Sequence, residues 1–123
     1  ILNVGTKRTL TSGERAAYDA PFPSASFQAG ARAFPALVPA STTDPASAAN
    51  IAAWEVFSRW EKPFLLTFSD GDPITRGGDR YVSARVPGTR GQPHVTLRGG
   101  HFLQEDSPTE FATAVNELIA RGR

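Results

Sequence analysis

Residues 97–108 read Leu-Arg-Gly-Gly-His-Phe-Leu-Gln-Glu-Asp-Ser-Pro. An apolar stretch leads into two glycines, His101 stands on the resulting turn, and Ser107 and Pro108 open a helix. An imidazole titrates near neutral pH, so a histidine on a loop just past a strand is well placed to transfer protons. The alternative is a histidine that only satisfies its own hydrogen bonds within the fold.

A second apolar run, residues 64–68, predicts a strand that helices cover on both faces, and carboxylates follow it. Open α/β sheets place their sites beyond the carboxyl ends of neighbouring strands. We expect Asp72 to accept a hydrogen bond from one imidazole nitrogen of His101 and so to fix the tautomer of the ring. We favour Asp72 over Asp70 because Pro73 fixes the backbone at the rim of the loop. Either aspartate could instead cap the turn.

From Asp44 onward, the pattern alternates between helix and strand. We expect a helix from Asp44, with Pro45 in its first position, to about Trp60; a strand over 64–68; a helix over 78–86; a strand over 94–98; and a last helix that begins with a Ser107–Glu110 capping box and ends near Gly122. This order predicts the α/β class, with parallel strands and right-handed crossovers between them.

The first part of the chain carries no convincing strand. Thr11 and Glu14 have the spacing of a capping box, which predicts a helix through Tyr18. Ser24 is expected to cap a second helix, which carries Phe27, Ala31 and Phe34 and which Pro35 and Pro39 terminate. Residues 40–44 are expected to form a linker.

Composition narrows the class of protein further. The 123 residues are 40% hydrophobic, which suits one packed domain or a large piece of one. A net charge of +1 with interspersed signs gives no basic stripe for nucleic acid, and no apolar run is long enough to cross a membrane. The absence of cysteine excludes disulfides and thiolate metal sites and fits a cytoplasmic protein. His94 and His101 lie at opposite ends of one predicted strand, so we expect no shared metal ion.

Two observations favour a piece of a longer protein. The sequence has no methionine, and two strands cannot bury three helices. The order Asp…His completes the triad of α/β-hydrolases, whose nucleophile comes first in the chain. We find no Gly-x-Ser-x-Gly elbow and no aspartate equivalent, so we expect the nucleophile to lie outside this sequence.

Three segments together resemble the haloalkane dehalogenases. Residues 17–23 with 28–35 resemble the cap domain of that family, residues 68–75 its acid loop, and residues 99–106 its histidine loop. The resemblance implies the C-terminal portion of an α/β-hydrolase fold, with parallel strands and flanking helices, preceded by part of a helical cap. Residues 1–43 would be the rear of the cap and residues 44–123 part of the core.

The resemblance also implies a reaction, in which an aspartate displaces halide from carbon and the resulting alkyl-enzyme ester is hydrolysed. His101 matches the general base and Asp72 its acid partner. Positions that match the wall of an apolar substrate pocket are Phe34, Pro35 and Val38 from the cap, and Ile74 and Phe102 from the core. The implied partners are a small apolar halogenated substrate, water, halide ion and the N-terminal segment of the same enzyme. No cofactor, metal, nucleic acid or membrane is implied.

Two alternatives stay open. An epoxide hydrolase or an esterase of the same fold would differ in the residue on the missing elbow and in the tryptophans that bind halide. The second alternative is a catalytically inactive remnant, which would act through binding or assembly at the exposed edge of its sheet.

Overall fold

The structure, a computed structural model, describes residues 2–122, which form two compact units. We call Ile1–Thr9 together with Phe57–Arg123 the sheet unit, and Leu10–Val56 the helical unit. The chain passes from the sheet unit to the helical unit between Thr9 and Leu10, and back between Val56 and Phe57. The sequence instead predicts a domain boundary between residues 43 and 44. The assignment of 1–43 to a cap and 44–123 to a core stays a prediction.

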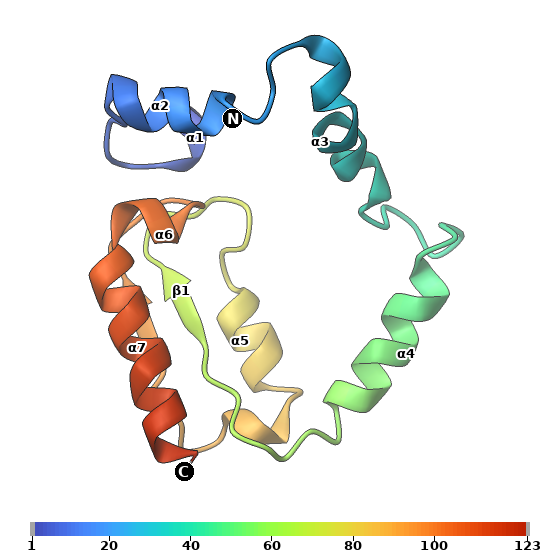
Figure 1. Cartoon of the computed structure of the whole chain (residues 1–123). Coiled ribbons are helices and arrows are strands. Elements are labelled where there is room, and N and C mark those ends of the chain that lie inside the picture. The colour runs from blue at the N-terminus through green and yellow to red at the C-terminus, as the bar shows by residue number, and fades with distance from the viewer. Residues whose placement is uncertain (1, 123) are drawn as a thin grey trace. The chain divides into compact units, whose positions relative to one another are not determined.

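In the sheet unit, two short strands pair in parallel. Its elements are α1 (Leu2–Gly5), β1 (Thr67–Ser69), α5 (Gly78–Ser83), the 3-10 turn η3 (Pro87–Thr89), β2 (Val95–Leu97), α6 (Leu103–Asp106) and α7 (Pro108–Arg121). Thr67 pairs with Val95, and Ser69 pairs with Leu97. Figure 1 shows β1 running between α5 and α7. The predicted parallel pairing of strands among helices is therefore confirmed in the described part of the chain.

Both strands are shorter than predicted. The expected strand over 64–68 is confined to Thr67–Ser69 because the preceding backbone bonds elsewhere: Phe64 N donates to the Gly88 carbonyl at 3.0 Å, and Leu66 N donates to His94 Nδ1 at 3.1 Å. Neither bond belongs to a regular ladder. The strand expected over 94–98 likewise narrows to Val95–Leu97.

The helices that follow the strands also differ in detail from the prediction. The helix expected over 78–86 ends at Ser83, and Val86 instead precedes η3. The last helix begins at Pro108, as expected, but its predicted capping box is wrong. The Ser107 hydroxyl donates to the Arg98 carbonyl at 2.6 Å and makes no cap bond to the helix. A buried serine thus joins α7 to the end of β2.

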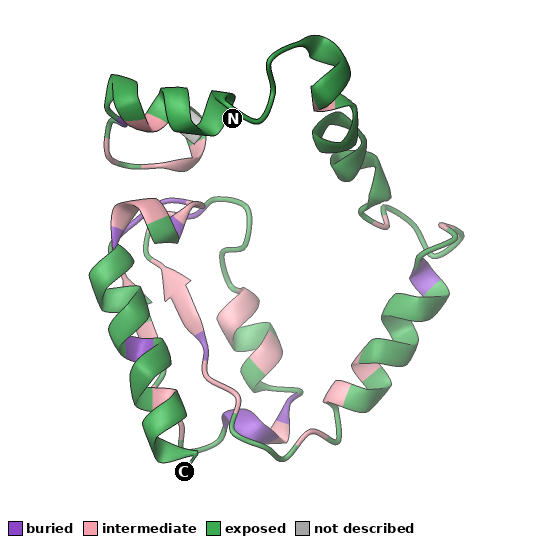
Figure 2. Cartoon of the chain, in the orientation of Figure 1, coloured by how far each residue is buried: buried purple, intermediate pink, exposed green. Residues whose placement is uncertain are grey.

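The core of the sheet unit is small. The buried apolar side chains here are Leu66, Val86, Leu103 and Ala114. Three apolar side chains of α7 stay largely uncovered, since Phe111, Val115 and Ile119 are 36–51% exposed, and only Ala114 of α7 is buried. In Figure 2, most of α7 is coloured as exposed, and a buried position directly precedes β1. Within the described part of the sheet unit, no second layer covers these side chains of α7.

The helical unit is a chain of short helices. It contains α2 (Ser12–Asp19), the 3-10 turn η1 (Ala25–Gln28), α3 (Ala29–Ala33), the 3-10 turn η2 (Phe34–Leu37) and most of α4 (Ser47–Phe57). The predicted capping box is confirmed: Thr11 Oγ1 accepts from Glu14 N at 3.2 Å, and Glu14 Oε2 accepts from Thr11 N at 2.7 Å. Thr11 therefore fixes where α2 begins.

Two other helix predictions are corrected in this unit. Ser24 makes no side-chain cap bond, and the single helix expected after it is divided into η1, α3 and η2. The helix expected from Asp44 begins instead at Ser47, because Asp44 Oδ1 accepts from Ala46 N at 2.9 Å and closes a turn before the helix. Among residues 2–122, no helix is long and apolar enough to cross a membrane.

Candidate active site

The histidine loop begins with two buried glycines at the end of β2. Gly99 N donates to Asp70 Oδ1 at 3.0 Å, and Gly100 N donates to Asp106 Oδ2 at 2.7 Å. A Cβ atom at Gly100 would collide with the carbonyl of Gly5, so this backbone approach admits only glycine. Carboxylates thus hold two successive amide groups directly before the imidazole of His101.

The acid loop places Asp72 against that imidazole. The Asp72 side chain is 7% exposed, and its carboxylate accepts three hydrogen bonds. Ile74 N donates to Oδ1 at 2.8 Å, while the Thr75 hydroxyl and His101 Nδ1 contact Oδ2. The bonds from Ile74 and Thr75 fold the loop back on Asp72 as a turn, and they hold the carboxylate independently of its contact with His101.

The two loops bring His101 and Asp72 into direct contact, with His101 Nδ1 at 3.0 Å from Asp72 Oδ2. An ionised carboxylate only accepts hydrogen bonds, so the proton of the neutral ring must lie on Nδ1. Nε2 then keeps a lone pair, and the His101 side chain is 33% exposed. This arrangement can take a proton from water and stabilise the imidazolium that forms.

The surroundings of Asp72 keep it charged. Burial on its own raises the pKa of the carboxyl, but the hydrogen bonds from Thr75, His101 and Ile74 outweigh it and lower the pKa to about 2. The carboxylate is therefore ionised throughout the range in which an imidazole gives and takes protons.

Asp70 has different partners from Asp72. Its Oδ1 lies 2.9 Å from Lys7 Nζ and also accepts from Gly99 N. The hydrogen bond from Lys7, followed by that from Gly99, lowers the pKa of the Asp70 carboxyl. Of the two carboxylates that the sequence offers, only Asp72 has a hydrogen bond to His101.

Two of the predicted pocket residues flank this pair. The Phe102 ring meets the His101 ring edge to face, with centroids 5.1 Å apart, and the Ile74 side chain, within the acid loop, is 71% exposed. The other three, Phe34, Pro35 and Val38, lie in and after η2 of the helical unit, where all three are exposed. The role of these five residues in a pocket stays a prediction.

Sequence reasoning missed two side chains that shape the site. Thr75 contacts Asp72, and the Asp72-Pro73-Ile74-Thr75 spacing, typical of a turn closed by an aspartate, could have indicated it. Asp106 accepts backbone hydrogen bonds from Lys7, Arg8 and Gly100. The donors at residues 7 and 8 lie 98 to 99 residues away in the chain, so no local pattern predicts this contact.

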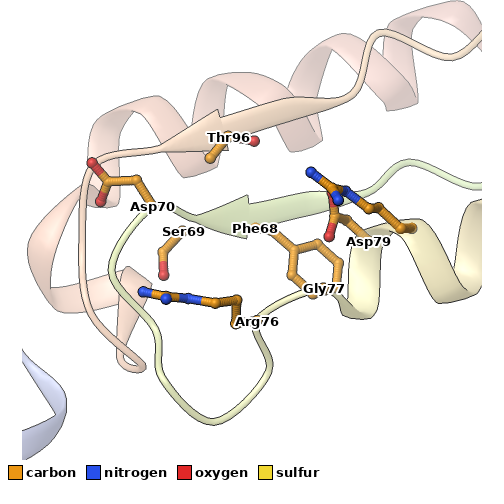
Figure 3. Close-up of a pocket in the computed structure, with 8 residues that line it drawn as sticks. Phe68, Ser69, Asp70, Arg76, Gly77, Asp79 and Thr96 are labelled. Atoms are coloured by element: carbon orange, nitrogen blue, oxygen red, sulfur yellow. The ribbon is translucent and has the colours of Figure 1, made fainter.

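A pocket of about 280 Å³ lies between the end of β1 and the start of α5. Figure 3 shows Asp70, Ser69 and Arg76 around it, with Asp79 of α5 on the far wall. Neither His101 nor Asp72 lines this pocket, so it does not belong to the His–Asp pair. Among the described residues, no three histidine or carboxylate side chains are grouped closely enough to hold a metal ion.

Comparison with known proteins gives close relatives for nearly the whole chain. It is 51% identical over 115 residues to a protein named haloalkane dehalogenase from Mycobacterium marinum, covering 94% of this chain and 39% of that protein. It is 53% identical over 112 residues to haloalkane dehalogenase 1 from Mycobacterium tuberculosis, covering 91% of this chain and 37% of the relative. For a haloalkane dehalogenase from Psychrobacter cryohalolentis, the identity is 50% over 116 residues, with shares of 94% and 38%.

These similarities confirm the resemblance that the cap, acid-loop and histidine-loop segments indicate. The chain spans somewhat more than a third of the length of the relatives that it matches. No family model matches it.

Proposed function

We propose that this chain, a homologue of the haloalkane dehalogenases over nearly its whole length, supplies the His–Asp half of the catalytic triad of a hydrolase that cleaves carbon–halogen bonds. The observation that carries the proposal is the 3.0 Å contact between His101 Nδ1 and Asp72 Oδ2 in a chain about 50% identical to such enzymes. Residues 44–123 would form part of an α/β-hydrolase core and residues 1–43 part of its cap.

The reaction needs a carboxylate nucleophile in addition to this pair, supplied by an upstream segment of the same or another polypeptide. Its oxygen attacks the carbon that bears the halogen, the carbon–halogen bond breaks, and halide leaves with the bonding electrons. The product of this first step is an alkyl ester on the enzyme.

His101 acts in the second step. Nε2 accepts a proton from water as the water oxygen attacks the ester carbonyl, and the ester bond breaks to release the alcohol and restore the carboxylate. Asp72 stabilises the imidazolium through Nδ1, and the proton then passes from His101 to solvent. The sum is haloalkane and water giving alcohol, halide and a proton.

The substrate would be small and apolar. The resemblance to these enzymes implies that apolar side chains line its pocket, at positions that match Phe34, Pro35, Val38, Ile74 and Phe102. Apolar walls favour an alkyl chain and exclude water other than the molecule that hydrolyses the ester.

The variant His101→Gln should allow the first step, halide release with formation of the alkyl ester, and block the second, hydrolysis of that ester. With a short 1-haloalkane, the complete polypeptide that carries this chain should release halide over many turnovers. His101→Gln should release about one halide per active site, and its intact mass should rise by that of the alkyl group. The matched control is His94→Gln, since His94 lies directly before β2 and its side chain bonds only Leu66 N within the described chain; it should turn over like the wild type.

Three outcomes contradict the proposal in different ways. Full turnover by His101→Gln would remove the histidine from the mechanism. Hydrolysis of an ester or an epoxide without halide release would support the other enzymes of this fold. Lack of any hydrolysis by the complete polypeptide would leave a protein that acts through binding or assembly.

A further inference from the structure

The backbone of the histidine loop is held at several successive points. The carbonyl of Arg98 accepts from the Ser107 hydroxyl, Gly99 N and Gly100 N each donate to a carboxylate, and Phe102 N donates to the Gly5 carbonyl at 2.9 Å. His101 is therefore flanked on both sides by backbone groups with specific partners.

Among these partners, Asp106 makes the largest set of backbone bonds. Its Oδ2 accepts from Gly100 N at 2.7 Å and from Lys7 N at 2.9 Å, and its Oδ1 accepts from Lys7 N at 3.1 Å and Arg8 N at 3.0 Å. One carboxylate thus joins the amide directly before His101 to two amides from the beginning of the chain.

The charge environment agrees with this geometry. Burial on its own raises the pKa of the Asp106 carboxyl, but the N–H groups of Arg8, Lys7 and Gly100 outweigh it and hold that pKa below its usual value. The Arg8 side chain also pairs with Glu105 Oε2 at 2.7 Å, next to Asp106 in the sequence. The segment 5–8 and the loop 99–106 form one hydrogen-bonded assembly.

We propose that Asp106 is a positioning residue for His101: it holds the Gly100 backbone against residues 5–8 and thereby sets where the imidazole stands over Asp72. The inference rests on the proposed function for its kinetic consequence, because a displaced imidazole slows proton transfer from water but leaves the carboxylate nucleophile untouched. Asp106 does not itself touch the reacting atoms.

The variant Asp106→Asn tests this with almost no change in shape. The asparagine side chain has only one acceptor oxygen. In either orientation its NH₂ group faces backbone N–H donors, so the hydrogen bonds that one of the two carboxylate oxygens accepts are lost. We expect hydrolysis of the alkyl ester to slow on the order of 10- to 100-fold, the effect of a misplacement of about 1 Å. The single-turnover release of halide, which precedes it, should keep its rate.

A second readout does not depend on turnover. In proton NMR spectra of the protein labelled with ¹⁵N in histidine, the Nδ1–H of His101 bonded to a carboxylate gives a resonance far downfield. Asp106→Asn should shift or broaden that resonance. The matched control Glu110→Gln, on the exposed first turn of α7, should change neither the resonance nor either rate.

The outcomes are distinguishable. Equal slowing of halide release and ester hydrolysis, or an unchanged His101 resonance, would overturn the positioning role. Absence of halide release in the wild type would overturn the proposed function alone, and the resonance would then decide the role of Asp106. If Asp106→Asn does not fold, Asp106→Ser, which keeps one oxygen acceptor, should show the same selective slowing, and its failure to do so would also overturn the inference.

Discussion

Asp70 and Asp72 are separated by one glycine, and their carboxylates hold different groups: Asp72 bonds the imidazole of His101, and Asp70 bonds the amide of Gly99 and the ammonium of Lys7. In this one loop, Asp72 orients the His101 ring, and Asp70 holds the backbone of Gly99 by a hydrogen bond. The two roles can be separated by neutralising each carboxylate in turn.

Asp72→Asn should be far more damaging than Asp70→Asn. An asparagine at position 72 can offer NH₂ to Nδ1, which favours the tautomer with the proton on Nε2 and removes the base; loss of ester hydrolysis of about 10³- to 10⁴-fold is expected. The amide introduced by Asp70→Asn keeps an oxygen for Gly99 N, and the exposed pair with Lys7 is worth little, so this variant should lose less than about tenfold. Single-turnover kinetics of ester hydrolysis measure both, and equal losses would contradict the separate roles.

The stability of the sheet unit should depend on acid through Asp72. Its pKa in the folded protein, about 2, lies below the ordinary value of 3.8, so ionised Asp72 stabilises the fold above about pH 4. That stabilisation, about 2 kcal/mol at about 1.4 kcal/mol for each pKa unit, is lost as the pH falls from about 4 through 2. Urea denaturation at several pH values should show this slope, and Asp72→Asn should reduce it. An unchanged slope in the variant would assign the acid sensitivity to other carboxylates.

Local signals were sufficient for part of this structure. The Thr11 capping box, the helix that starts at Pro108 and the parallel pairing of the strands all depend on residues close in sequence or on alternation of elements. The predicted contact between Asp72 and His101 followed from the rule that sites gather beyond the carboxyl ends of parallel strands.

Long-range competition explains the rest. Leu66 looked like part of a strand, but its amide bonds the His94 side chain. Ser107 looked like a helix cap, but its hydroxyl donates to the Arg98 carbonyl. The Asp106 carboxylate accepts hydrogen bonds from two backbone amides that lie 98 to 99 residues away in the chain. In each case, a partner outside the local pattern replaced the partner that the pattern indicated.

Gly100→Ala should destabilise the sheet unit, because the new Cβ would collide with the Gly5 carbonyl and separate segment 5–8 from the histidine loop. The expected cost is about 1–3 kcal/mol, the usual range for overpacking. Gly122→Ala is the matched control, since a Cβ there meets its nearest atom, the Leu118 carbonyl oxygen, at 3.7 Å in ordinary contact. Chemical denaturation measures the free energy of unfolding of both, and a Gly100→Ala variant as stable as Gly122→Ala would show that the loop relaxes without loss.

Thr11→Ala and Ser24→Ala should differ although the sequence marks both positions as helix caps. Thr11 Oγ1 accepts from Glu14 N, and its own amide bonds the Glu14 carboxylate, so alanine leaves a helix-terminal amide without its partner and costs about 1 kcal/mol. Ser24 makes no side-chain cap bond, and its hydroxyl contacts only Ser26 among the described residues, so alanine there should be nearly neutral. Amide hydrogen exchange over residues 15–20 should speed up about fivefold in Thr11→Ala and stay unchanged in Ser24→Ala. Faster exchange in both variants would mean that α2 depends on the segment after it more than on its own cap.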